Sequence, residues 1–275
     1  MPTLVELLEA GVQFGHKKQK SHPKAQEYIF TLREGVYVID LEKTAAYLER
    51  ALDFLKKEIN LGKTVLFVGT KRQAKDITRE VAESLNMPFV THRWLGGTLT
   101  NFETLNRSLK TLEKLTNEMN SPEFESLTKK EKKMINDKVA KLELMFGGVK
   151  DMKRLPDALF IVDGKGEEIA VKEAAIVEIP CIAICDTDVD PSKITYPIPA
   201  NDDAPKSLNF IMNIVKEAGM EAMGTSVKNE AVNKEMSIKE EITEKPTEKP
   251  VEKAEKKMVK KAVKKTATKE KKEEK

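Results

Sequence analysis

The chain has 275 residues, with 48 Lys and Arg against 45 Asp and Glu and a formal net charge of +3. This length fits either one large domain or one domain with an inserted segment and a tail, and no apolar run approaches the roughly 18 residues that a membrane-spanning helix needs. The first sixteen residues contain Glu6 and Glu9 but no Lys or Arg, which excludes a secretory signal and leads us to expect a cytosolic protein.

The net positive charge comes from the C-terminal part of the chain. Residues 226–275 hold 16 Lys and 11 Glu, whereas the remaining residues hold 32 basic and 34 acidic side chains. Net charge therefore does not mark the body as a nucleic-acid binder, and such a function must rest on local clusters of cations. Cys181 and Cys185 would lie about 13 Å apart on a strand, too far for a disulfide, so we expect two reduced, buried cysteines.

Alternating short strands and helices dominate the predicted body. Thr3 and Glu6 form a capping box that begins a short helix ending at Gly11. Further strands are predicted at 28–32, 36–41, 65–68, 88–90, 158–162 and 182–185, and further helices at 44–59, 72–85, 167–175 and 205–218. Continuous apolar runs such as 65–68 are typical of strands buried on both faces of a parallel sheet. We therefore predict an α/β domain with a mostly parallel sheet.

The segment 103–146 breaks this alternation and is predicted to form an antiparallel helical hairpin. Two capping boxes, Thr100 with Glu103 and Thr128 with Glu131, begin its helices. Steps of three and four residues separate the apolar positions Leu105, Leu109, Leu112, Leu115 and Met119, and then Ile135, Val139, Leu142 and Phe146. Such a narrow apolar seam indicates a coiled-coil pair that projects from the body, and the alternative is a pair lying flat on the sheet.

The chain is therefore divided into three parts. Residues 1–102 and 147–224 form the α/β globular domain, and residues 103–146 form the hairpin insertion. Residues 225–275 form a Lys/Glu-rich tail without the apolar residues of a packed core, which we predict to be disordered. Lysine pairs recur every four residues within this tail, so a basic helix against phosphate is the alternative to a solvated tail.

Three segments carry candidate phosphate-binding residues. The loop 16–24 holds Lys17, Lys18, Lys20 and Lys24 and no acidic residue. Exposed lysines of this kind neutralise phosphates and position a protein on RNA, whereas the alternative is an ordinary solvated surface.

The other two segments follow predicted strands. Lys71-Arg72 lies where a buried strand passes into a helix, at the strand end where parallel sheets bind ligands. Arg93 and Trp94 precede Gly96-Gly97, a pair of glycines that a core strand would not favour and that would let the backbone approach an anionic partner closely. The Trp94 indole would either stack on RNA at an exposed edge or fill the base of the hairpin against the sheet.

Several residues were considered as parts of a catalytic or metal-binding site, and the sequence supports each of these interpretations less well than phosphate binding. Gly62-Lys63-Thr64 lacks the first glycine of a P-loop and precedes a strand instead of a helix. His16, His22 and His92 lack zinc-site spacing. Asp163, Asp186 and Asp188 follow strands and could hold Mg²⁺ in a phosphoryl-transfer enzyme, but no phosphate cradle or nucleophile accompanies them, and such acids also form turns and cap helices.

A series of motifs occurs in order along residues 1–218. They are Phe14-Gly15-His16, Gly69-Thr70-Lys71-Arg72-Gln73-Ala74, Arg93-Trp94-Leu95-Gly96-Gly97, Leu99-Thr100-Asn101, Gly147-Gly148-Val149-Lys150-Asp151-Met152, Leu155-Pro156-Asp157-Ala158-Leu159-Phe160, Ile169-Ala170-Val171-Lys172-Glu173-Ala174, Asp186-Thr187, Asp190-Pro191, Tyr196-Pro197-Ile198-Pro199 and Asn201-Asp202-Asp203-Ala204. This series resembles the bacterial ribosomal protein S-two family, the second protein of the small subunit. Two departures are Ser21-His22-Pro23, where the family usually has Trp-Asn-Pro, and Ala200, where a glycine commonly precedes Asn-Asp-Asp.

The resemblance implies a flavodoxin-like or Rossmann-like sheet with a protruding helical hairpin. It also implies a structural, non-catalytic, ribosome-associated protein of the cytoplasm. Such a protein binds small-subunit rRNA between head and body, lies near the mRNA exit, and contacts neighbouring proteins including the large first protein of the subunit.

Our main hypothesis is thus an rRNA-binding structural protein without cofactor, metal site or catalytic residue. Its predicted rRNA-binding residues are Lys17, Lys18, Lys20, Lys24, Lys71, Arg72, Arg93, Trp94, Gly96 and Gly97. One alternative is a nucleotide- or Mg-dependent α/β enzyme that uses the strand-end aspartates. Another is a protein-only scaffold that docks through its hairpin.

Overall fold

The computed structural model describes the backbone of residues 1–243 and the side chains of residues 1–224. The chain forms two compact units, Met1–Val227 and Lys228–Lys275. The sheets, the hairpin and the candidate site all belong to the first unit. Helix α8 (Pro205–Thr243) begins there, and its backbone continues past Gly224, where the tail was predicted to begin. The predicted disorder of residues 244–275 lies outside the described residues.

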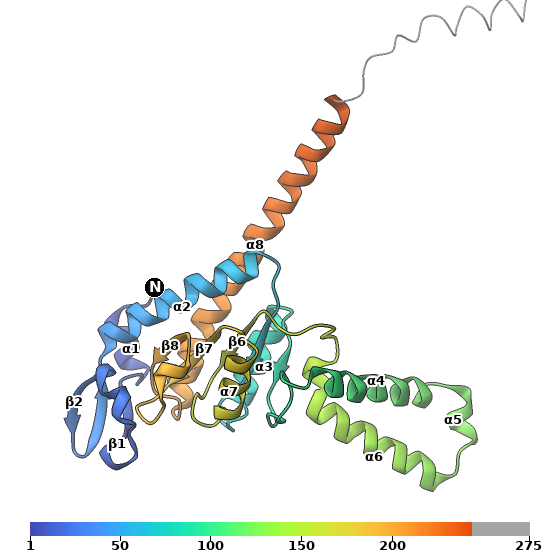
Figure 1. Cartoon of the computed structure of the whole chain (residues 1–275), viewed down its shortest axis with the longest axis horizontal. Coiled ribbons are helices and arrows are strands. Elements are labelled where there is room, and N and C mark those ends of the chain that lie inside the picture. The colour runs from blue at the N-terminus through green and yellow to red at the C-terminus, as the bar shows by residue number, and fades with distance from the viewer. Residues whose placement is uncertain (244–275) are drawn as a thin grey trace, which may run out of the picture. The chain divides into compact units, whose positions relative to one another are not determined.

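A five-stranded parallel sheet forms the centre of the first unit (Figure 1). Its strands lie in the order β5-β4-β6-β7-β8, which is the strand order 2-1-3-4-5 of flavodoxin-like folds. In chain order they are β4 (Val65–Val68), β5 (Phe89–Val90), β6 (Ala158–Ile161), β7 (Cys181–Cys185) and β8 (Tyr196–Pro199). The predicted α/β class and parallel sheet are confirmed. Strand β8 was missed because it contains two prolines, which β8 tolerates as an edge strand paired only with β7.

Each face of this sheet is covered by helices, so alternate strand residues enter two separate cores. Val65 and Phe67 belong to the first core, whereas Leu66 and Val68 belong to the second. The helices of the first core are α1 (Leu4–Glu9), α2 (Leu41–Asn60), α3 (Lys75–Ser84) and the first half of α8. The second core is formed by α7 (Glu168–Ile176) and by the base of the hairpin. Burial on both faces explains why these strands are continuous apolar runs.

A second, three-stranded antiparallel sheet lies near the N-terminus. It consists of β1 (Phe14–Lys17), β2 (Ile29–Arg33) and β3 (Val36–Ile39) in the order β1-β3-β2. Strand β1 was not predicted, and its last two residues, His16 and Lys17, were assigned to the basic loop 16–24. Its residue Gly15 approaches Thr187 so closely that an added Cβ would lie 2.6 Å from the threonine methyl carbon. Glycine is therefore required where β1 meets the loop that follows β7.

The helical hairpin consists of α4 (Phe102–Met119) and α6 (Lys129–Phe146), joined through the short helix α5 (Pro122–Ser126) (Figure 1). All predicted seam residues are buried or half-buried in the second core, which therefore continues from the sheet into the hairpin. The predicted Thr128–Glu131 capping box is present. The Thr100–Glu103 box is wrong: Asn101 is the N-cap residue of α4, and Thr100 donates its hydrogen bonds to Glu173. The domain boundaries inferred from the sequence remain a prediction.

Candidate nucleic-acid interface

The carboxyl ends of the parallel strands bring the three candidate segments to one edge of the sheet. Lys71 and Arg72 follow β4, and Arg93 follows β5. The basic loop reaches the same edge because it is bound to Thr187, which follows β7. The backbone N–H of His16 donates to the Thr187 hydroxyl at 2.9 Å, and the backbone N–H of His22 donates to the Thr187 carbonyl at 2.8 Å.

Five of the predicted cations are exposed and make no ion pair among the described residues. They are Lys17, Lys18, Lys20, Arg72 and Arg93. The three lysines lie at the end of β1 and in the 3-10 turn Lys18–Lys20. Cations without an intramolecular partner break no ion pair when they contact a phosphate, so these side chains are suited to bind an external polyanion.

Lys24 and Lys71 differ because each already has carboxylate partners. Lys24 contacts Asp190 at 3.1 Å, but its side chain is 57% exposed. Lys71 is 22% exposed and contacts Asp202 at 2.7 Å, Asp203 at 2.6 Å and Asp163 at 3.6 Å. Lys71 thus joins the loops that follow β4, β6 and β8. Its role in phosphate binding remains a prediction, and its observed contacts stabilise the edge of the sheet.

His16 forms a second internal link at this edge. Its Nδ1 lies 3.0 Å from a carboxylate oxygen of Asp186, and its Nε2 lies 3.4 Å from Asp203. The pairing with Asp186, opposed by burial and aided by neighbouring aspartates, raises the pKa of His16 to about 9. His16 is therefore a cation at neutral pH. Together with Lys71 it neutralises part of the acidic edge from within.

The enzyme alternative depends on Asp163, Asp186 and Asp188, which lie in the loops that follow the strands. Asp163 Oδ1 accepts hydrogen bonds from the backbone N–H groups of Lys165 at 2.9 Å and Gly166 at 2.8 Å. Asp186 pairs with His16, and burial raises the pKa of Asp188. Among the described residues, no group of three or more His, Cys, Asp or Glu side chains is arranged to hold a metal ion. Asp163 and Asp186 thus form a turn and ion pairs, as the structural alternative proposed, whereas one buried oxygen of Asp188 has no hydrogen-bond partner among the described residues.

Flavodoxin-like folds bind ligands at the carboxyl ends of the two strands where the strand order reverses. In this chain those strands are β4 and β6. Here Thr70 donates a short hydrogen bond to Glu167, and Lys71 contacts Asp163. Burial raises the pKa of Glu167, more than its bond with Thr70 lowers it. The usual nucleotide position of this fold is therefore bridged by the chain's own side chains.

Trp94 lies in the second core and not at the exposed edge that stacking on RNA would require. The residue is 5% exposed, and its Nε1–H donates to Glu173 on α7 at 3.1 Å. The structure therefore favours the packing alternative, in which the indole fills the base of the hairpin. Arg93, next to it, remains exposed.

Glu173 fixes the conformation of the loop that carries Arg93. Besides Trp94, its carboxylate accepts hydrogen bonds from the backbone N–H groups of Gly97, Leu99 and Thr100 and from the Thr100 hydroxyl, at 2.7–3.1 Å. Burial alone would raise the pKa of Glu173, but these donors outweigh it and hold the pKa below the usual value of 4.5. The loop conformation is therefore set by a charged side chain from α7.

The two glycines of this loop serve different needs. Gly97 has a φ of +91°, a conformation that strongly favours glycine, and it donates to Glu173. Gly96 is exposed, and an added Cβ would meet no atom within 4 Å. Gly96 thus leaves open backbone surface beside Arg93.

Sequence reasoning missed both His16 and Glu173 as organising residues. A signal for Glu173 exists, because Ala170, Val171, Ala174 and Val177 define the buried face of its helix and Glu173 lies on that face. A charged residue at such a position requires buried partners. His16 gives no comparable signal, because its aspartate partners come from loops more than 150 residues away in the sequence.

Comparisons with known proteins agree with this architecture. A family model described as "Ribosomal protein S2" matches residues 7–222. The small ribosomal subunit protein uS2 of Petrotoga mobilis is 48% identical over 219 residues, covering 80% of this chain and 76% of that protein. The uS2 protein of Helicobacter hepaticus is 42% identical over 235 residues, covering 86% and 88%. No helix in the described part of the chain is long and apolar enough to cross a membrane. The chain belongs to the ribosomal protein S2 family.

Proposed function

We propose that this chain binds small-subunit rRNA between the head and the body of the subunit through the cations at the carboxyl edge of its sheet. Family membership supports the coarser statement that it is a structural, non-enzymatic protein of the small ribosomal subunit, associated with ribosomes in the cytoplasm. The proposal adds the ligand, the surface and the position.

The observation that carries the proposal is the grouping of Lys17, Lys18, Lys20, Arg72 and Arg93 at one edge, exposed and without ion pairs among the described residues. Phosphate contacts require this arrangement because a polyanion approaches from one side. The acidic residues Asp186, Asp202 and Asp203 of the same edge are partly neutralised by His16 and Lys71. Lys24, which is exposed despite its ion pair, extends the same surface.

The Arg93 loop contributes shape as well as charge. Its conformation is fixed by Glu173 before any partner binds, so no ordering of this loop is required on binding. The open backbone at Gly96 then allows a sugar-phosphate chain to approach closely.

Binding of the full chain to small-subunit rRNA tests this proposal. We expect replacement of Lys17, Lys18 and Lys20 by Gln to weaken binding by roughly tenfold or more, because each phosphate contact adds to the affinity. The matched control replaces Lys129, Lys130 and Lys133, three lysines near the far end of the hairpin that are also exposed and unpaired among the described residues. Equal weakening by both triple variants would contradict a specific role for the edge.

We further propose that the hairpin contacts neighbouring small-subunit proteins, with the large first protein of the subunit among the partners of the chain. Met134 and Leu144 of α6 are 64% and 60% exposed, so α6 presents apolar side chains outside the seam. Cross-linking of assembled small subunits from Lys133 and Lys141, which lie beside these residues, would identify the partner. Cross-links to rRNA alone would contradict a protein contact.

A further inference from the structure

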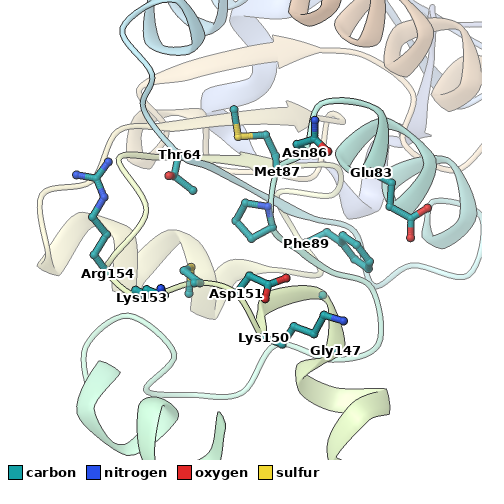
Figure 2. A pocket seen from close by; sticks show the side chains of 13 residues that line it. Thr64, Glu83, Asn86, Met87, Phe89, Gly147, Lys150, Asp151, Lys153 and Arg154 are labelled. Atoms are coloured by element: carbon teal, nitrogen blue, oxygen red, sulfur yellow. The ribbon is translucent and has the colours of Figure 1, made fainter. Parts of the chain in front are cut away.

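We infer that a hollow at the opposite, amino edge of the parallel sheet binds one nucleotide of a single-stranded RNA segment. The hollow has a volume of about 700 Å³ and lies between the starts of β4 and β5 and the base of the hairpin (Figure 2). This volume is within the roughly 300–1,000 Å³ of small-molecule sites. None of the cations assigned above to rRNA lines it.

The lining combines the three chemical elements that a nucleotide requires. Met87, Pro88 and Phe89 supply apolar surface on which a base can stack. The Thr64 hydroxyl and the Asn86 carboxamide supply hydrogen-bonding groups, and neither side chain makes a hydrogen bond to another described residue. Asn86, at the rim, has a φ of +50°, a left-handed conformation that asparagine tolerates better than most other residues.

Cations for the phosphates come from the segment that follows the hairpin. Lys150 and Lys153 are exposed and make no ion pair among the described residues, whereas Arg154 contacts Asp157 at 3.2 Å. In Figure 2 the Phe89 ring lies above Asp151 and Lys150, and Arg154 lies across the hollow from them. The same segment, Lys150 to Lys153, also lines an adjacent hollow of about 660 Å³ along α4, where Lys110 is a further cation. The lining of this second hollow also contains Glu113, Glu143 and Asp151, so it adds cations for a strand that leaves the first hollow but no net positive charge.

The acidic residues of the lining favour a nucleotide over an acidic peptide. Glu83 and Asp151 share the hollow with the cations. A carboxylate accepts hydrogen bonds from the amino group of cytosine or adenine, whereas it repels the carboxylates of an acidic peptide. A base-paired duplex does not fit either, because its bases are stacked on their neighbours and cannot enter a hollow.

The close contact at the back of the hollow indicates that its shape is fixed. An added Cβ at Gly148 would lie 2.3 Å from the Phe89 carbonyl oxygen and 2.6 Å from its ring. The guanidinium carbon of Arg79 lies over this ring, 5.6 Å from the ring centroid. Phe89 is therefore held in place by the chain itself before any ligand binds.

Ultraviolet cross-linking of the full chain to a short labelled single strand of cytidine and adenosine tests this inference. We expect cross-linked peptides to contain Met87 to Phe89, and we expect a matched RNA duplex not to cross-link there. Replacing Lys150 and Lys153 by Gln should reduce the salt slope of single-strand binding by about 1.4, or about 0.7 per lost phosphate contact. Asn86→Gly, which keeps the left-handed backbone conformation and removes the carboxamide, should weaken the cross-link without affecting folding.

The control replaces Lys138 and Lys141 on α6, which are equally exposed and unpaired among the described residues. Undiminished cross-links at Met87 to Phe89 in Asn86→Gly, or an equal loss of slope in the control, would overturn the inference. Binding of polyglutamate in the hollow, together with the absence of a single-strand cross-link there, would assign the hollow to an acidic peptide instead. Failure of the carboxyl-edge triple variant to weaken rRNA binding would refute only the proposed function, because that variant leaves the hollow unchanged.

Discussion

Replacement of Glu173 by Gln is the most informative single change, because this carboxylate determines the conformation of the loop beside the proposed interface. Oε1 accepts hydrogen bonds from Trp94 and Gly97, and Oε2 accepts from Leu99 and Thr100. An amide keeps one acceptor oxygen and replaces the other with an NH₂ group. Whichever oxygen is lost, two N–H donors then face another donor.

The expected destabilisation follows from that count. A hydrogen-bonding group left unsatisfied in the interior costs about 1–3 kcal/mol, so two such groups cost about 2–6 kcal/mol. Glu173 is only 6% exposed, so water does not replace the lost partner. For a domain of this size each kcal/mol lowers Tm by roughly 2–4 °C, which gives a decrease of roughly 4–24 °C.

Thermal and urea unfolding of Glu173→Gln measure this directly. Glu168→Gln is the matched control on the same helix, because Glu168 is half-exposed and pairs with Lys172 at 2.9 Å. We expect the control to lose less than about 1 kcal/mol. Equal stability of Glu173→Gln and the native chain would refute the idea that this carboxylate organises the loop.

Three further predictions concern other contacts. The pKa of His16 is raised from 6.5 to about 9, so its contribution to the free energy of unfolding is complete below pH 6.5 and is lost as pH rises through about 9. When the free energy of unfolding is measured against pH, His16→Gln should remove this loss. Gly148→Ala should destabilise the fold by about 1–3 kcal/mol in urea unfolding, because its Cβ would lie 2.3 Å from the Phe89 carbonyl oxygen. Leu112→Ala should cost about 2–5 kcal/mol in the same assay, because Leu112 is buried in the hairpin seam.

Each of these predictions has a control or a contradicting outcome. A His16→Gln variant that loses stability between pH 6.5 and 9 as the native chain does would exclude His16 as the source. Gly96→Ala should change stability by less than about 0.5 kcal/mol, because nothing lies within 4 Å of its added Cβ. If Met134→Ala on the exposed face of α6 costs as much as Leu112→Ala, the seam is not the main source of hairpin stability.

Local patterns were sufficient to predict most of the fold. Strand β4 is a continuous run of apolar residues that is buried on both faces, and its predicted bounds agree with the structure. The Thr128–Glu131 capping box and the apolar steps of the hairpin are likewise local features, and both are present. Strand β8 could not be identified in this way, because Pro197 and Pro199 are unusual in a strand and only its position at the edge of the sheet permits them.

The candidate site was less accessible to sequence reasoning because charge pairing depends on tertiary structure. The basic loop and Arg72 are visible as cations in the sequence, but nothing local distinguishes Lys71, with its three aspartate partners, from Arg72, which has none among the described residues. The position of Trp94 also could not be predicted from local sequence. Its neighbours suggested an exposed edge, whereas its actual partner is Glu173, which lies 79 residues further along the chain.

The salt dependence of rRNA binding by the full chain and by an Arg72→Gln, Arg93→Gln double variant tests the central claim most directly. Both arginines are exposed and make no ion pair among the described residues, so each is free to contact a phosphate. We expect the slope of log affinity against log salt concentration to fall by roughly 0.7–0.9 for each arginine removed. An unchanged slope would contradict the claim that cations gathered at the carboxyl edge of the sheet bind the RNA.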